Sequence, residues 1–318
     1  MPTERPIRIG ISSCLLGQKV RFDGGHKRDA FLVDTFGVFV EWVPVCPEVE
    51  LGLGIPREAL RLVRKGDEIR MANTRSGRDI STEMRQWARS RVDALAGEDL
   101  SGYVLKKDSP SCGMERVKIY AEAGMAEKNG RGYFAEALMG RFPRLPVEEE
   151  GRLSDPRLRD NFVERVFAYV RLRALFAARW TVGDLVRFHT AHKMALLAHS
   201  TDGYAELGRL VARARSLDRA VAETRYRELF MDALAKLATT RKHTNVLLHM
   251  AGHFKALLEA DEKQELLGSI EDYRLGLVPL VVPLTLIKHH VRRHKVEYLA
   301  GQVYLDPHPK ELMLRNHV

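Results

Sequence analysis

The sequence predicts an α/β N-terminal domain followed by an all-α C-terminal domain. Before residue 140, short runs of alternating apolar residues end in turn residues and alternate with helical patterns, as in βα units. After residue 155, apolar residues recur at i, i+3 and i+4. Residues 141–155 carry two prolines and an acidic run, which indicates the domain boundary or a linker. We therefore expect domains at residues 1–145 and 146–318.

The first domain is expected to alternate strands and helices. Ile7, Ile9 and Ile11 alternate and predict the first strand. The further expected elements are a helix over 27–36, a strand over 38–45, a hairpin from 59–64 and 68–71, a helix over 83–95 with Ser81 and Thr82 as its N-cap, a buried strand over 103–105, and a segment over 117–138 that ends in a helix.

The second domain is expected to begin at Asp155-Pro156, where an N-cap residue precedes a proline suited to the first helical turn. Helical spacing of apolar residues follows over 162–174, 183–197, 204–214, 220–238, 244–260 and 284–299. No repeat of fixed period is evident among these segments.

The composition is that of a soluble globular protein, with 45% hydrophobic and 29% charged residues. The longest apolar run, Leu275 to Ile287, is interrupted by Gly276, Pro279 and Pro283 and is shorter than the ~20 residues that span a bilayer. The N-terminus lacks the apolar core of a signal peptide, so we expect a cytoplasmic protein. In that compartment an odd number of cysteines, here three, indicates metal binding or catalysis.

The net charge of +9 is unevenly distributed. From residue 151 onward, 27 Lys and Arg stand against 19 Asp and Glu, and 11 of the 12 histidines lie there. Such an excess suggests a polyanionic partner for the second domain. The alternative is a solvated helical surface that happens to be rich in arginine.

The three cysteines occupy similar positions, because each follows a predicted strand. Cys14 follows the first, Cys46 the second, and Cys112 the buried strand near residue 105. If these strands are parallel neighbours, the thiols converge at the sheet edge where open α/β folds bind ligands. Their spacing, 32 and 66 residues, matches no zinc-finger pattern.

A site of three thiolates with an open fourth position suits a 4Fe–4S cluster. The alternative is three small buried residues, a common role of free cysteine. The residues next to the cysteines argue against this alternative. Ser12 and Ser13 precede Cys14, Glu48 follows Cys46, and Ser109 and Ser111 precede Cys112. A carboxylate and hydroxyls beside one centre are typical of acid–base and positioning groups.

Four segments of the first domain resemble the thiouracil desulfidase family, over residues 7–140. They are Ser12-Ser13-Cys14-Leu15-Leu16-Gly17, Val20-Arg21-Phe22-Asp23-Gly24, Cys46-Pro47-Glu48 and Ser109-Pro110-Ser111-Cys112-Gly113. This resemblance implies a Rossmann-like fold, an oxygen-sensitive 4Fe–4S cluster on three cysteines, and non-redox removal of sulfur from thiolated uracil. One departure is Phe22, which stands where we expect Tyr.

The second domain resembles the YbgA-type helical domain. The matching segments are Phe188-His189-Thr190-Ala191-His192-Lys193, Lys242-His243-Thr244-Asn245-Val246-Leu247, Gly252-His253-Phe254-Lys255, Pro279-Leu280-Val281-Val282-Pro283-Leu284 and Tyr304-Leu305-Asp306-Pro307-His308-Pro309. Fusions of the two domains resemble the bacterial tRNA 4-thiouridine desulfidases. This implies tRNA as partner and 4-thiouridine as substrate, with free 2-thiouracil as another; no membrane or partner protein is expected.

The resemblance also implies a role for each matching residue. Cys14, Cys46 and Cys112 would bind the cluster, Glu48 would activate water, and Ser109 or Ser111 would hold the base or the developing charge. Ser13 and Asp23 are weaker substrate-binding candidates, and the segment from Asp23 to Gly25 is also typical of a plain turn.

Candidate RNA contacts in the basic domain are Lys193, Arg241, Lys242, Lys255, Lys288, Arg292 and Arg293. The pairs His189/His192 and His249/His253 have metal-binding spacing, but no H-E-x-x-H pattern accompanies them, which favours packing or RNA contact.

Three other functions are considered. A redox iron–sulfur protein is disfavoured by the count of three cysteines beside a carboxylate. A non-enzymatic RNA-binding protein with structural cysteines would be colourless and keep its tRNA affinity. A transferase with a cysteine nucleophile is disfavoured, because the sequence shows no evident pairing of a cysteine with a histidine.

Overall fold

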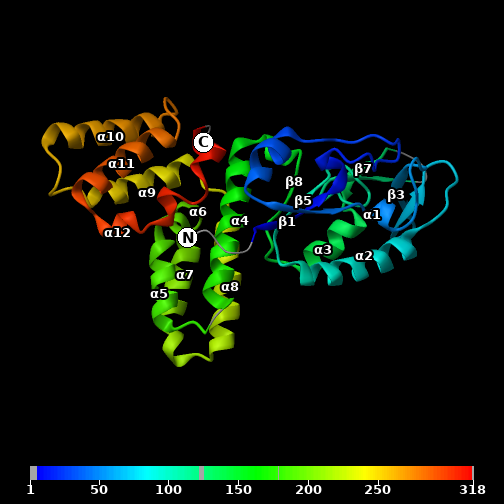
Figure 1. Cartoon of the computed structure of the whole chain (residues 1–318), viewed down its shortest axis with the longest axis horizontal. Coiled ribbons are helices and arrows are strands. Elements are labelled where there is room, and N and C mark those ends of the chain that lie inside the picture. Colours follow the sequence, from blue (N-terminus) through cyan, green and yellow to red (C-terminus); the bar gives the residue numbers. More distant parts are fainter. Residues whose placement is uncertain (1–5, 122–124, 178, 317–318) are drawn as a thin grey trace. The chain divides into compact units, whose positions relative to one another are not determined.

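The computed structural model describes residues 6–121, 125–177 and 179–316. The chain divides into two compact units, Met1–Ser154 and Asp155–Val318. The first is α/β and the second is helical, which confirms the predicted fold classes (Figure 1). Within the described ranges, no helix is both long and apolar enough to span a membrane. The extreme N-terminus, on which the expected absence of a signal peptide partly rests, lies outside these ranges.

A parallel four-stranded sheet forms the centre of the first unit. Its strands are β1 (Arg8–Ser12), β2 (Glu41–Val45), β5 (Leu100–Leu105) and β8 (Val147–Glu149), in the order β2-β1-β5-β8. Each neighbouring pair is parallel, with Ser12 opposite Val45 and Ile11 opposite Val104. Every residue of β5 is buried, as expected for a parallel sheet covered on both faces.

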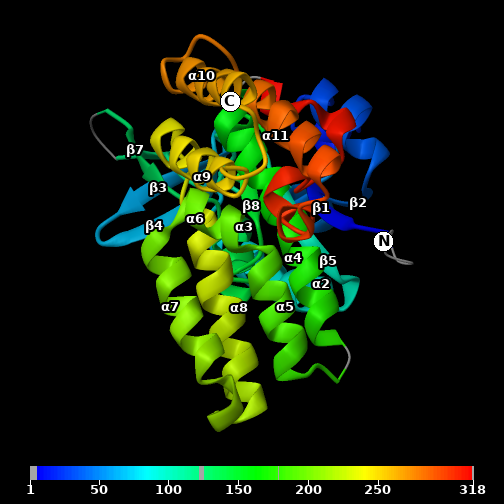
Figure 2. The same ribbon diagram turned by 90° about the vertical axis from the view of Figure 1, so that its left-hand side faces the viewer.

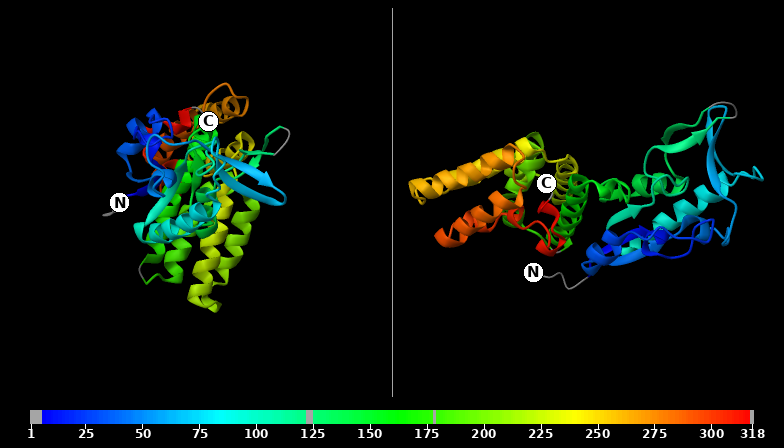
Figure 3. Two further views of the ribbon diagram at one scale, coloured as in Figure 1. Left: turned by 90° about the vertical axis from the view of Figure 1, so that its right-hand side faces the viewer. Right: turned by 90° about the horizontal axis from the view of Figure 1, so that it is seen from above.

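A second, mixed sheet lies in the same unit. It consists of β3 (Leu60–Lys65), β4 (Glu68–Asn73), β6 (Val117–Tyr120) and β7 (Glu127–Gly130), in the order β4-β3-β6-β7. The antiparallel pairing of β3 and β4 confirms the predicted hairpin, drawn in light blue in Figure 3.

Three α-helices accompany the sheets: α1 (Pro47–Glu50), α2 (Ser81–Leu95) and α3 (Tyr133–Arg141). The ring of Phe134 on α3 lies 5.7 Å from that of Trp87 on α2 and 5.7 Å from that of Tyr103 on β5. Aromatic packing therefore fixes α2 and α3 against the central strand.

Three local expectations for the first unit were wrong. The expected helix over 27–36 is reduced to a π-turn over 31–35 and a 3₁₀ turn over 36–38. The backbone N–H groups of Lys27 and Asp29 instead donate to the carbonyls of Cys14 and Leu15. Helix α2 begins at Ser81, so Ser81 and Thr82 are not its N-cap, and the Ser81 hydroxyl oxygen accepts from Met71 N–H at 2.8 Å. The segment 141–155, expected to be the domain boundary or a linker, is not a linker, because it contains β8, which completes the central sheet beside β5; the boundary between the two units lies within it, after Ser154.

The second unit is entirely helical in its described part. Its helices are α4 (Pro156–Ala177), α5 (Val182–Ala191), α6 (Lys193–His199), α7 (Thr201–Ala212), α8 (Arg219–Ala235), α9 (Thr240–Gly252), α10 (Ala260–Arg274), α11 (Val281–His294) and α12 (Glu297–Ala300). Helices α5, α7 and α8 run side by side (Figure 2). Asp155 caps α4 as predicted, because its Oδ1 accepts from Arg157 N–H and Leu158 N–H.

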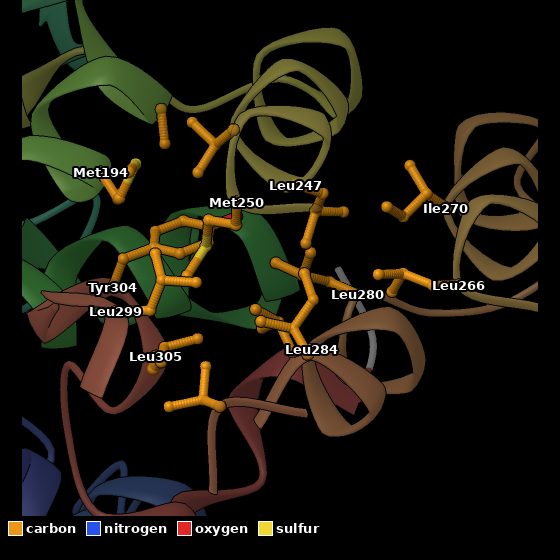
Figure 4. Packing of buried hydrophobic residues seen from close by; sticks show 14 of the residues in the cluster. Met194, Leu247, Met250, Leu266, Ile270, Leu280, Leu284, Leu299, Tyr304 and Leu305 are labelled. Carbon is orange, nitrogen blue, oxygen red and sulfur yellow. The ribbon is translucent and has the colours of Figure 1, made fainter. Parts of the chain in front are cut away.

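Two apolar clusters hold this unit together. One joins α4, α5, α7 and α8 around Tyr226 and Phe230. The other joins α6, α9, α10, α11 and the C-terminal segment around Met250 and Tyr304 (Figure 4). The helix expected over 183–197 is two helices, α5 and α6, which meet at His192. Helix α10 was not predicted as a separate helix.

Candidate functional site

The three cysteine thiols line one cavity of about 430 Å³. Cys14 lies in a 3₁₀ turn directly after β1, Cys46 directly follows β2, and Cys112 lies on the loop after β5. Because β2, β1 and β5 are adjacent and parallel, their carboxyl ends meet at one edge of the sheet. The strand positions read from the sequence therefore place the thiols at one site.

The cavity is lined by more cationic than anionic side chains. Its basic residues are Arg21, Lys27, Arg57, Lys106 and Lys107. Its acidic residues are Glu48 and Asp108. Such a surrounding favours an anionic group in the cavity, including thiolates bound to a metal centre.

Glu48 is held by a charged and a neutral donor. Its Oε2 accepts a hydrogen bond from Arg57 Nε at 2.8 Å and forms an ion pair with Arg57 Nη2 at 2.7 Å. Its Oε1 accepts from the Ser111 hydroxyl at 2.8 Å. The Glu48 and Arg57 side chains are only 14% and 5% exposed, so the pair is shielded from solvent. The carboxylate is thus fixed in one orientation beside the thiols.

Arg57 was not identified from the sequence. Its Nη1 donates to the Gly54 carbonyl at 3.0 Å, and its Nη2 donates to the Val20 carbonyl at 2.9 Å. The guanidinium therefore joins α1 to the loop that follows Cys14. No motif marks this arginine, which is one of many in a basic chain; only its place after the glycine-rich loop could have drawn attention to it.

The two candidate serines have different partners. The Ser109 hydroxyl oxygen accepts from Ser111 N–H at 3.3 Å and from Cys112 N–H at 3.1 Å, and Ser109 lines the cavity. Ser111 is fully buried and donates to Glu48. Ser109 thus shapes the loop that carries Cys112, whereas Ser111 orients the carboxylate.

The thiols are protonated at neutral pH when no metal is bound. Burial raises the pKa of Cys14 to about 11; the neighbouring Cys46 adds to this shift and Lys106 opposes it. Burial also raises the pKa of Cys46, and raises that of Cys112 well above the ordinary thiol value. A metal centre must displace these protons, because the thiolate is the ligand.

The residues around the cavity fit an iron–sulfur cluster. Among the described residues, no three or more His, Cys, Asp or Glu side chains lie close enough together to hold one metal ion. In a 4Fe–4S cluster each thiolate binds a different iron, so its thiols are spread around a larger body. Three cysteines around one cavity, with soft sulfur donors, match that requirement.

The remaining candidates of the first unit are separated by the structure. Ser13 is buried and lines the cavity, as does the partly exposed Phe22. Asp23 lies in a turn, where its Oδ1 accepts from Gly25 N–H at 2.9 Å, and it is not among the described residues that line the cavity. The structure thus brings Ser13, Glu48 and Ser109 together with the three thiols, and Ser111 adjoins them through Glu48.

The candidate RNA contacts of the helical unit are not equivalent. Lys242 Nζ donates to the His199 carbonyl at 2.6 Å, Lys288 pairs with Asp306 at 2.6 Å, and Arg293 pairs with Glu262 at 2.5 Å. Lys193 lies 5.9 Å from the Tyr298 ring centroid. The three other candidates, Arg241, Lys255 and Arg292, are exposed.

The two histidine pairs also differ. His189 and His192 are buried, and they contact the Tyr226 hydroxyl and the Phe188 carbonyl respectively. His249 and His253 are exposed, with ring centroids 5.7 Å apart. The first pair therefore packs in the core, while the second remains open to a partner.

Comparisons with known proteins agree with this division of the chain. The model of the family described as 2-thiouracil desulfurase matches residues 9–150. The uncharacterized protein YbbK of Bacillus subtilis is 33% identical over 114 residues, which cover 33% of this chain and 72% of YbbK. The chain belongs to the 2-thiouracil desulfurase family.

This desulfurase-family chain carries a YbgA-like domain in its second half. A family described only as a protein of unknown function, DUF1722, matches residues 193–309. The uncharacterized protein YbgA of Escherichia coli is 35% identical over 163 residues, which cover 50% of this chain and 95% of YbgA. Both resemblances found in the sequence are therefore confirmed.

A solved structure is also similar to this desulfurase-family chain. It is described as the 4Fe–4S-dependent thiouracil desulfidase TudS, and the two chains are 30% identical. The match covers 46% of this chain and 93% of TudS, with a TM-score of 0.39.

Proposed function

We propose that this enzyme removes sulfur from thiolated uracil by hydrolysis, and that its main substrate is 4-thiouridine in tRNA, which becomes uridine. Free 2-thiouracil is a second substrate of the same site. Cys14, Cys46 and Cys112 would hold a 4Fe–4S cluster, and the basic helical unit would bind the RNA. The observation that carries this proposal is the placement of three thiols and the fixed carboxylate of Glu48 around one cavity.

The reaction exchanges a C=S bond for a C=O bond. Water supplies the oxygen, sulfide leaves with the two protons of that water, and no electron is gained or lost. It requires a base to take a proton from water and an acceptor for a soft sulfur atom. A 4Fe–4S cluster on three thiolates supplies that acceptor, because one iron keeps an open position and acts as a Lewis acid.

Glu48 is the base in this proposal, and its contacts identify the reactive oxygen. Oε2 accepts a hydrogen bond from Arg57 Nε and also lies 2.7 Å from Arg57 Nη2 in an ion pair, whereas Oε1 accepts one hydrogen bond from Ser111 and has no cationic partner. Because each carboxylate oxygen has two lone-pair sites, Oε1 retains one for a water proton. The same oxygen can then return the proton to the ring nitrogen of the base, and the ring passes it to the sulfide as the C–S bond breaks, so that both water protons leave with the sulfide.

Ser109 is the donor toward the substrate in this proposal. Its oxygen accepts two backbone N–H groups, so its own hydroxyl hydrogen remains available to a group in the cavity. A hydroxyl held in this way can stabilise charge that develops on the uracil ring. Ser13, which also lines the cavity, would contact the base from the Cys14 side.

The choice of tRNA rests on charge. A thiolated base within folded RNA must leave its stack to reach the cavity. The excess of 27 basic over 19 acidic residues from position 151 onward favours phosphate contacts that hold the RNA while this happens.

The proposal is tested by anaerobic turnover of thiolated tRNA and of free 2-thiouracil, followed by loss of the thiocarbonyl absorbance. Glu48→Gln should keep its iron and lose turnover by about 10²–10⁴-fold, because the amide is no base. The matched change Glu83→Gln, at an exposed carboxylate on α2, should leave both unchanged. Full turnover by Glu48→Gln would show that Glu48 is not the base.

The alternatives predict other results. A redox iron–sulfur protein would titrate reversibly and leave both thiolated substrates intact. An RNA-binding protein with structural cysteines would purify without iron under anaerobic conditions and still bind tRNA.

A further inference from the structure

Three aromatic side chains form an exposed cluster on the helical unit. The His253 ring, just after α9, stacks on Tyr298 of α12, with centroids 5.0 Å apart and planes at 28°. The His249 ring meets His253 edge to face, with centroids 5.7 Å apart and planes at 78°. Lys193 of α6 places its ammonium 5.9 Å from the Tyr298 ring centroid. We call these four side chains the ring cluster.

The ring cluster is open to solvent. His249 and His253 are exposed, and Tyr298 is half-buried. A Cβ added at Gly252, which directly precedes His253, would meet nothing within 4 Å. No described part of the chain therefore covers the backbone beside the rings.

Core packing does not account for this arrangement. The other histidine stacks of the unit, His192 on Phe188 and His189 on Tyr204, involve histidines that are only 2% and 8% exposed. Those rings are placed by the apolar core around them. His253 and His249 remain aligned at the surface, where burial contributes little.

The charges beside the rings favour an electron-rich, anionic partner. Partial burial lowers the pKa of His249, and the neighbouring charges of Lys193 and His253 add to the effect. His249 is therefore neutral at pH 7 and presents an uncharged ring, while Lys193 supplies a positive charge next to it. The four side chains contain no carboxylate.

We propose that the ring cluster is a stacking site for an unpaired nucleobase of RNA, with Lys193 beside its phosphate. Exposed His and Tyr rings stack on unpaired bases, and an adjacent lysine fixes the backbone. This inference rests on the proposed RNA partner of the helical unit and names the surface that contacts it. The excess of positive charge on the unit suits any polyanion, and the stacked rings select RNA, because a nucleobase has the flat aromatic face that stacking requires and a lipid headgroup has none.

The test measures binding of unthiolated tRNA, and of a short single-stranded RNA with one 2-aminopurine, by the full chain. His253→Ala should weaken binding by about 5- to 100-fold and reduce the quenching of 2-aminopurine, because one ring is lost from the stack. His253→Phe should restore both, since it keeps a ring. Tyr298 also packs against the apolar core, so it is changed only to Phe, which should bind normally.

Two controls separate stacking from charge and from folding. His289→Ala, at an exposed histidine of α11 outside the ring cluster, should bind like wild type. Lys193→Ala should reduce the slope of log affinity against log salt by about one, whereas His253→Ala should not change it.

Equal binding of RNA by wild type, His253→Ala and His253→Phe would show that the ring cluster is not a stacking site, and it would leave the proposed RNA partner intact. Equal losses for His253→Ala and His253→Phe would also overturn it, because the ring would then not matter. If wild type binds neither RNA, both the ring cluster and the RNA partner are wrong, while turnover of free 2-thiouracil still tests the cysteine cavity separately.

Discussion

At the scale of single residues, the site depends on how one carboxylate is held. Arg57 donates one charge-assisted hydrogen bond to Glu48 Oε2 and forms an ion pair with the same oxygen, while its other donors bind the Gly54 and Val20 carbonyls; the planar guanidinium makes these contacts at once, which an ammonium group does not. The Ser111 hydroxyl donates a hydrogen bond to Glu48 Oε1. These contacts leave Glu48 with one orientation, which is what a positioned base requires.

Arg57→Lys should therefore lower kcat while the protein keeps its iron and its KM. We expect a decrease of about 10- to 100-fold, since a carboxylate misplaced by a fraction of an ångström loses reactivity. Steady-state kinetics with free 2-thiouracil measure this effect without any RNA contribution. Arg57→Ala is less informative, because it leaves Glu48 without its buried partner and should also destabilise the unit.

Arg91→Lys is the matched control. Arg91 Nε donates to Glu50 Oε2 at 2.9 Å, on the same helix α1, but in a more exposed pair. Its kinetics should equal those of wild type. If Arg57→Lys also behaves like wild type, Arg57 has no positioning role.

Site residues could be predicted from the sequence where a reactive side chain lies close to the end of a predicted strand. Cys14, Cys46 and Glu48 lie within a few residues of strand ends, so their meeting follows from a parallel sheet. Arg57 acts through a contact nine residues away along an irregular loop, which no periodic pattern encodes. The different partners of Ser109 and Ser111 depend on hydroxyl orientation within one turn.

At the scale of elements, the N-terminus of α3 holds the loop that carries Cys112. Phe134 N–H donates to the Ser111 carbonyl at 3.0 Å, and Gly132 N–H donates to the Gly113 carbonyl at 2.8 Å. A Cβ at Gly132 would lie 2.4 Å from the Ser111 carbonyl oxygen and 2.8 Å from Cys112 N. Only glycine allows α3 to approach the loop so closely.

Gly132→Ala should displace the Cys112 loop and lower both the iron content and turnover. Iron analysis after anaerobic purification, with circular dichroism as a check on folding, measures this. Gly140→Ala on the same helix has no atom within 4 Å of the added Cβ, so it should keep its iron and be slightly more stable. Full iron content in Gly132→Ala would mean that the loop tolerates the displacement.

Buried histidines make the helical unit sensitive to acid. Burial lowers the pKa of His189 to about 4, and burial together with a nearby arginine lowers the pKa values of His192 and His243 to about 3. The unfolded chain takes up these protons near pH 6.5 and the folded unit does not, so stability falls as the pH drops below 6.5. Burial lowers the pKa of His199, but the paired Glu164 carboxylate outweighs burial and raises it; this contribution to stability is complete below pH 6.5 and is lost as the pH rises.

Below about pH 6, the three histidines with lowered pKa values give a loss on the order of 4 kcal/mol per pH unit, and His199, which is protonated in both the folded and the unfolded chain there, adds nothing to this slope. The melting temperature, followed by circular dichroism, should fall on the order of 10 °C per pH unit in that range. His243→Asn should reduce this slope by about one third, whereas the exposed His289→Asn should keep it. A melting temperature independent of pH between 6 and 5 would contradict the buried-histidine account.

Elements with strong periodicity were predictable, and short ones were not. The alternating Ile9 and Ile11 identify β1, and the hairpin of β3 and β4 follows from two β-rich runs. Strand β8 consists of a valine and two glutamates, so only its pairing with β5 makes it a strand. The N–H groups of Lys27 and Asp29 donate to the carbonyls of Cys14 and Leu15, so this segment follows the Cys14 turn instead of forming a helix.

At the scale of the whole molecule, two compact units divide the work in our proposal. The first contains the cavity, and the second contains most of the excess positive charge. The composition of the sequence indicated this division, because charge and histidine content change near residue 150. The desulfurase-family match over 9–150 and the DUF1722 match over 193–309 follow the same division.

Salt should therefore affect the two substrates differently. Raising the salt concentration from about 50 to 200 mM should increase KM for thiolated tRNA steeply, because counterion release drives phosphate binding. KM for free 2-thiouracil should change little, as the free base has no phosphate. Parallel salt dependence for both substrates would argue against RNA binding by the helical unit.

The central claim is that the three cysteines hold the cluster used for desulfuration. The most direct measurement compares iron, acid-labile sulfide and thiouracil turnover in anaerobically prepared wild type, Cys112→Ser and Glu48→Gln. We expect about four irons per chain in wild type and in Glu48→Gln, a loss of iron in Cys112→Ser, and turnover only in wild type. Turnover by wild-type protein that carries no iron, or by Cys112→Ser, would contradict the account.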